Sequence, residues 1–133
     1  NPAIKAWLQD CDGVIICPSN PFVSVAPILQ VPGMTEAISH LPIIAVSPIV
    51  AGMALKGPAA KMMQELQIPT TAKAIADQYK GLINGFVLDK TDAQSIRDLT
   101  IPAIATQSVM VTLEDRVALA RECIRFLGTL QSK

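Results

Sequence analysis

Three small polar side chains follow a short apolar run near the start of the chain and could hydrogen-bond a ligand. They are Ser19, Asn20 and Ser24, and the run spans residues 13–17. Pro18 has no N–H to donate to a sheet ladder, so a strand predicted over the run ends there. Open α/β sheets bind ligands outside the carboxyl ends of their strands, and the first amides of a following helix can bind an anion. A phosphate, a ribose or a purine edge would suit this loop; the alternative is that Ser19 or Asn20 only caps the helix.

A second loop repeats the arrangement. An apolar run over 43–47 is stopped by Pro48, and an irregular loop is predicted over 48–57. Lys56 lies near the end of this loop beside a helix start, and Gly57 lets a ligand come close to the backbone. A cation beside free helix amides makes an anion site. The alternative is a solvated lysine on a connecting segment.

Strand and helix patterns alternate along the chain, and this alternation predicts the elements that position the two loops. The predicted fold is α/β, a three-layer, Rossmann-like parallel sheet with a small helical insertion at about 56–81. We expect strands at 13–17, 43–47, 85–89 and 101–106, and helices at 2–8, 22–30, 35–40, 58 to about 66, 71–79, 92–98 and 113 to about 127.

Apolar spacing predicts which face of three helices is buried. The predicted faces are Ala59, Met62, Met63 and Leu66; Ala72, Ile75, Ala76 and Tyr79; and, packed on the sheet, Leu113, Val117, Ala120, Ile124 and Leu127. Thr112 and Asp115 are spaced as a capping box for the last helix. Asp89, at the end of a predicted strand, either binds a ribose or a metal or caps the next helix.

The composition is that of a globular domain without an excess of either charge. Of 133 residues, 50% are hydrophobic and 17% charged, with 11 Lys plus Arg against 11 Asp plus Glu. This balance argues against nucleic acid as a partner, and no apolar run is long enough to span a membrane. Cys11, Cys17 and Cys123 lack metal-ligand spacing, and we expect Cys17 in a strand and Cys123 in a helix as small hydrophobes. A cytoplasmic protein is predicted, with room for a homodimer.

Two long motifs resemble the 2-phospho-L-lactate transferase (CofD) family. One covers residues 16–29 (ICPSNPFVSVAPIL) with Val31, Pro32 and Gly33 after it, and the other covers residues 45–63 (AVSPIVAGMALKGPAAKMM). The resemblance extends over essentially the whole chain. It implies transfer of a phospholactyl or phosphoenolpyruvyl group from a guanosine diphosphate (GDP) carrier to the deazaflavin precursor of coenzyme F420, with release of GMP and with Mg²⁺ as cofactor.

The same resemblance implies roles for the residues of both loops. Ser19, Asn20 and Ser24 would line the nucleotide site. The phosphate side would be formed by Ser47, Gly52, Lys56 and Gly57. Catalytic residues and metal ligands are not identified among them.

The chain also departs from the family pattern. The Gly-rich opening strand and loop of the family are not present among the 7 glycines, so we expect residues 1–133 to be the C-terminal part of a CofD-like domain. By itself this part is expected to bind weakly or not at all, and without turnover. An alternative interpretation is a CofD-like regulatory module that binds nucleotide sugars without catalysis. A third is an interaction domain without a ligand.

Overall fold

The computed structural model describes residues 2–54 and 57–130 and places four parallel strands in one sheet. The strands lie in the order β1-β2-β5-β6, which follows the sequence. Their bounds are Val14–Ile16 for β1, Ile43–Val46 for β2, Gly85–Asp89 for β5 and Ala103–Thr106 for β6. All three pairings are parallel, so the four carboxyl ends lie at one edge.

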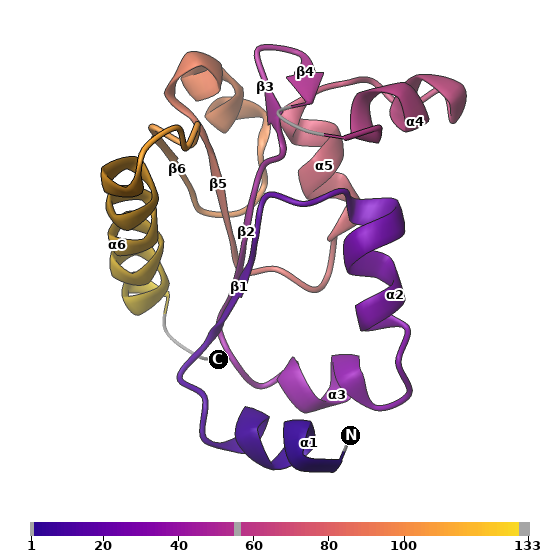
Figure 1. Ribbon diagram of the computed structural model, residues 1–133, viewed down its shortest axis with the longest axis vertical. Coiled ribbons are helices and arrows are strands. Elements are labelled where there is room, and N and C mark those ends of the chain that lie inside the picture. The colour runs from indigo at the N-terminus through magenta and orange to yellow at the C-terminus, as the bar shows by residue number, and fades with distance from the viewer. Residues whose placement is uncertain (1, 55–56, 131–133) are drawn as a thin grey trace.

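Helices cover both faces of this sheet, which confirms the predicted three-layer α/β fold (Figure 1). The long helix α6 (Leu113–Thr129) lies on one face, and α2 (Ala26–Leu29) and α5 (Ala72–Gln78) lie on the other. The remaining helices are α1 (Pro2–Gln9), α3 (Met34–Ile38), α4 (Ala59–Glu65), the π-helix η1 (Pro21–Val25) and the 3₁₀-helix η2 (Lys90–Asp98). Within the described residues no helix combines the length and the apolar character needed to cross a bilayer.

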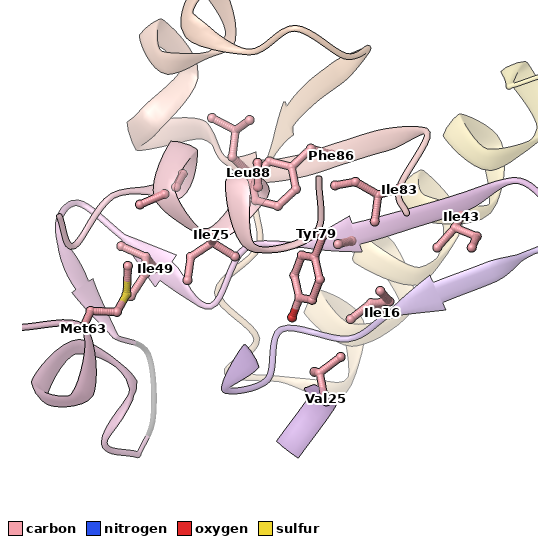
Figure 2. Packing of buried hydrophobic residues seen from close by; sticks show 14 of the residues in the cluster. Ile16, Val25, Ile43, Ile49, Met63, Ile75, Tyr79, Ile83, Phe86 and Leu88 are labelled. Atoms are coloured by element: carbon pink, nitrogen blue, oxygen red, sulfur yellow. The ribbon is translucent and has the colours of Figure 1, made fainter. Parts of the chain in front are cut away.

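The larger part of the core lies on the α5 side of the sheet, as Figure 2 shows. Phe86 of β5 and Ile75 of α5 are fully buried there, and Met63 reaches the same cluster from α4. All four residues predicted to face inward from 71–79 are buried. Of the face predicted for α4, Ala59 and Met63 are buried, whereas Leu66 is exposed.

The buried face predicted for α6 is wrong except at Leu127, which is half-buried against the sheet. Leu119, Cys123 and Phe126 pack on the sheet instead, and Leu113, Val117 and Ile124 are exposed by 67%, 41% and 63%. One contact that favours this face is visible on β5. A Cβ at residue 85 would collide with Phe126 and Leu130, so the glycine at the start of β5 leaves room for that end of the helix.

The irregular loop predicted over 48–57 contains a hairpin. Strands β3 (Ile49–Val50) and β4 (Met53–Ala54) pair antiparallel across Ala51 and Gly52. Both turn residues have positive φ, 49° and 76°, as the type I′ turn of a two-residue hairpin requires. Alanine is unusual at such a φ, and this explains why turn chemistry did not indicate the hairpin.

Two other predicted helices differ from the structure in type, and most of the remaining elements differ from their predicted bounds by one or two residues. The helix expected over 22–30 is the π-helix η1 followed by α2, and π-helices are rare. The helix expected over 92–98 is the 3₁₀-helix η2, which begins at Lys90.

Candidate functional site

The loop after β1 is organised by the Asn20 side chain. Its Oδ1 accepts hydrogen bonds from the backbone N–H groups of Phe22 (2.9 Å) and Val23 (3.3 Å), which makes Asn20 the N-cap of η1. The residue is 9% exposed. The first amides of this helix therefore bond to the chain itself, and the capping alternative holds for Asn20. The anion site expected from these two amides is not free in this conformation.

The other end of the Asn20 amide has spare hydrogen-bonding capacity. Nδ2 lies 3.4 Å from Sδ of Met62 in α4. A thioether is a weak acceptor, whereas an amide nitrogen carries two donors. Asn20 thus joins the first loop to the helix that follows the second loop, and a stronger acceptor would compete readily for Nδ2.

The two predicted site serines of this loop have unused hydroxyls. Ser19 is half-buried and Ser24 is exposed on η1. Neither side chain makes a hydrogen bond within the part of the chain that the structure describes. Cys17 is also exposed here, beyond the end of β1, so the expectation that it is a strand residue packed as a small hydrophobe is wrong. Cys123 does pack in a helix, and burial raises the pKa of its thiol to about 11.

The loop after β2 begins at the same edge, because Ile16 of β1 is paired with Ala45 of β2. Ser47 is fully buried, and its hydroxyl donates to the Ile49 carbonyl (2.9 Å) and accepts from the Ile49 N–H (3.1 Å). These bonds close the turn into the β3-β4 hairpin. The Ser47 side chain is therefore occupied by the fold, and a ligand would have to displace it.

The remaining predicted residues of this loop are exposed or lie outside the described residues. Gly52 forms the hairpin tip, where the Ala51 N–H donates to Oδ2 of Asp92 (3.0 Å) and ties the tip to η2. Gly57 is exposed with φ 72°, and nothing lies within 4 Å of the position that a Cβ would take. Lys56 lies outside the described residues, so its predicted phosphate contact stays a prediction.

Asp89, at the carboxyl end of β5, is buried and saturated with hydrogen bonds. Oδ1 accepts from the N–H (3.0 Å) and hydroxyl (2.8 Å) of Thr91, and Oδ2 from the N–H (2.9 Å) and hydroxyl (3.1 Å) of Ser108. Burial by itself would raise the pKa of Asp89, but these bonds outweigh it and hold the pKa below its ordinary value. The prediction that Asp89 caps the next helix is confirmed. Sequence reasoning missed Ser108 as its second partner.

The described residues do not fit a magnesium site by themselves. Mg²⁺ is held by carboxylate oxygens and water, and both oxygens of Asp89 are already used within the fold. No three His, Cys, Asp or Glu side chains gather anywhere in residues 2–54 and 57–130.

A cavity of about 210 Å³ lies away from these loops. Its lining includes Ile83 and Ile101, which precede β5 and β6, so it opens at the amino-terminal edge of the sheet. Sequence reasoning did not predict it. The candidate site at the carboxyl edge is separate from this cavity.

Comparison with known proteins gives a consistent family. The family model described as 2-phospho-L-lactate transferase CofD matches residues 1–125. A 2-phospho-L-lactate transferase of Methanocaldococcus jannaschii is 36% identical over 128 residues, covering 96% of this chain and 41% of the relative. A phosphoenolpyruvate transferase of Streptomyces coelicolor is 32% identical over 129 residues, covering 92% and 40%. The chain thus spans about two fifths of the length of the curated relatives it matches.

Proposed function

The chain belongs to the CofD family, and from this membership we propose that it forms the nucleotide-binding part of a transferase of coenzyme F420 biosynthesis. The donor is a GDP-linked three-carbon acid, and the acceptor is a deazaflavin. Two relatives support this proposal, because their names specify transfer of 2-phospho-L-lactate and of phosphoenolpyruvate. The nucleotide-sugar alternative has no such support among them.

The observation that carries the proposal is the set of unused polar groups at the carboxyl end of β1. The hydroxyls of Ser19 and Ser24 and the weakly bonded Nδ2 of Asn20 offer donors and acceptors for a ribose or a guanine edge. Ligands of open α/β sheets bind at this edge. Gly57 and Lys56 would face the phosphates, one by leaving room for them and the other by its charge.

The proposed transfer forms one bond and breaks one. The acceptor hydroxyl oxygen bonds to the phosphorus that carries the acid, while the bridging P–O bond to guanylate breaks. GMP leaves with the electron pair of that bond, and the hydroxyl proton passes to water or a base. Such reactions depend chiefly on positioning and on neutralising charge. Mg²⁺ would supply neutralisation, with ligands that the described residues do not bring together.

A chimaera tests this function. In it, this chain replaces the matching region of the M. jannaschii relative. Titration calorimetry then measures the affinities for GDP and for UDP, both in the chimaera and in its double variant Ser19→Ala, Ser24→Ala. We expect preference for GDP, release of GMP with donor and deazaflavin, and an affinity about tenfold lower in the double variant. Thr100→Ala, which removes an exposed hydroxyl just before β6 at the opposite edge of the sheet, is the control. A folded chimaera that binds UDP as well as GDP would contradict the proposal.

A further inference from the structure

The hairpin β3-β4 projects beyond the carboxyl ends of the sheet strands (Figure 1). Its base is fixed, because Ile49 is fully buried and Ser47 closes the turn that leads into it. Its tip is not fixed by packing, since Ala51, Gly52 and Met53 are exposed. Each strand has only two residues, and a short two-stranded hairpin is marginally stable by itself. The orientation of the tip therefore depends on contacts with other elements.

Asp92 of η2 provides such a contact. The backbone N–H of Ala51 donates to its Oδ2 (3.0 Å), and within residues 2–54 and 57–130 this is the only hydrogen bond between the hairpin tip and another element. Ala51 has a φ of 49°, a left-handed conformation that is unfavourable for a residue with a Cβ. A hydrogen bond to an ionised acceptor is stronger than one to a neutral acceptor. The carboxylate of Asp92 therefore holds the tip in a conformation that Ala51 would not favour by itself.

Asp92 is itself held in place by the rest of η2. Asp89, at the end of β5, caps this helix and accepts hydrogen bonds from Thr91, the neighbour of Asp92. At the other end of the helix, Ile96 and Leu99 pack on the core. In a capping box, the acidic side chain of the first turn reaches back to the N-cap backbone. Oδ2 of Asp92 instead accepts from a residue 41 positions earlier, and so connects the hairpin to the end of β5.

We propose that Asp92 is a positioning residue for the phosphate side of the nucleotide site. The hairpin begins at the carboxyl edge of the sheet, where ligands of open α/β sheets bind, and the chain continues from it toward Gly57. A carboxylate repels a diphosphate, so Asp92 acts through the Ala51 N–H and not by direct contact with the nucleotide. This role rests on the proposed function, which places Gly57 beside the phosphates, and adds the residue that fixes the hairpin before it.

The test separates binding of the phosphates from binding of guanosine. The chimaera described above is compared with its variants Asp92→Ala and Asp92→Asn. The control is Asp98→Ala, which removes an exposed carboxylate at the other end of η2. Titration calorimetry measures the affinity for GDP, and an NMR titration measures the weaker affinity for guanosine.

The two substitutions of Asp92 should differ. We expect Asp92→Ala to lower the affinity for GDP about tenfold and to leave the affinity for guanosine unchanged. Asp92→Asn retains an oxygen that can accept from Ala51, so its affinity for GDP should stay within about threefold of that of the unsubstituted chimaera. Asp98→Ala should change neither affinity.

Hydrogen exchange provides a second readout that needs no ligand. In the chain alone, NMR follows the exchange of the backbone amides over residues 49–54. We expect Asp92→Ala to raise these exchange rates about tenfold, because the hairpin opens more often without its connection to η2. Asp92→Asn and Asp98→Ala should leave the rates close to those of the wild-type chain.

Several results would overturn the role of Asp92. Equal losses of GDP and guanosine affinity in Asp92→Ala would show a general structural effect. If Asp92→Asn binds GDP as weakly as Asp92→Ala, the charge matters and the hydrogen bond to Ala51 does not. Unchanged GDP affinity or unchanged exchange in Asp92→Ala would show that this bond does not position the hairpin. An unsubstituted chimaera that does not bind GDP would instead contradict the proposed function, and this role with it.

Discussion

The loops that follow β5 and β1 leave the same edge of one sheet but use their polar groups in opposite ways. At β5, the two carboxylate oxygens of Asp89 accept hydrogen bonds from Thr91 and Ser108, so both are already used within the fold. At β1, Oδ1 of Asn20 accepts hydrogen bonds from its own helix, whereas the one partner of Nδ2 among the described residues is the thioether of Met62. Polar residues at a strand end therefore indicate a ligand site only where their donors and acceptors are not already hydrogen-bonded within the fold.

Of the substitutions that test this contrast, we expect Asp89→Asn to have the largest effect on stability. The amide that replaces one oxygen faces N–H and O–H donors, so at least one buried donor loses its acceptor. We expect the free energy of unfolding to fall by about 2 to 3 kcal/mol, measured by urea denaturation. Asp98→Asn, an exposed carboxylate at the end of η2, should change it by less than about 0.5 kcal/mol. Similar stability of the two variants would show that Asp89 is not a structural group.

Acidification should remove part of the same stabilisation. Hydrogen bonds hold the pKa of Asp89 below its ordinary value despite burial, so the folded chain binds fewer protons at this site than the unfolded chain. Its contribution is complete above the ordinary aspartate pKa of about 3.9 and declines as the pH falls through the lower, folded-state pKa. The gap in unfolding free energy between wild type and Asp89→Asn should therefore narrow between pH 7 and pH 3. The pKa of Asp115 is also lowered, but this residue is present in both proteins and cancels.

At the β1 end the effect on stability is smaller and can be separated from binding. Asn20→Ala should lower the unfolding free energy by about 1 kcal/mol, because the cap of η1 is lost. Asn20→Asp keeps a capping oxygen and removes the Nδ2 donor, but it places a carboxylate oxygen against the Met62 thioether at a buried position, so we expect it to lose some stability as well. In the chimaera, GDP affinity should fall with both variants if Nδ2 contacts the nucleotide. Unchanged affinity in Asn20→Asp would limit Asn20 to capping.

Much of the fold could be predicted because its signals are local. The bounds of the strand at 85–89 were predicted without error, and the capping box of α6 forms between Thr112 and Asp115. The inward face of α5 follows from the spacing of its own residues. In each case the pattern and the structure it specifies lie within about ten residues of each other.

What could not be predicted depends on partners far along the chain. The face that α6 buries depends on contacts such as that of Phe126 with Gly85, which lies in a different element. The second partner of Asp89 is Ser108, 19 residues away. The exposed residues Leu113, Val117 and Ile124 show the same limit, because their apolar spacing predicted a buried face that the sheet does not cover. The sequence identified this candidate site by residue type. Only the structure distinguishes the polar groups that are hydrogen-bonded within the fold from those that are not.

The smallest expected effect on stability belongs to Ser24. Its side chain is exposed on η1 and makes no hydrogen bond within the described part of the chain, so Ser24→Ala should change the unfolding free energy by less than about 0.5 kcal/mol. Ser47→Ala is the matched comparison, because that hydroxyl is buried and closes the hairpin turn; it should cost about 1 kcal/mol. In the chimaera the order should invert, with GDP affinity reduced more by Ser24→Ala than by Ser47→Ala. If Ser47→Ala weakens GDP binding more, the nucleotide site centres on the β2 loop, and the unused groups after β1 are solvent-facing only.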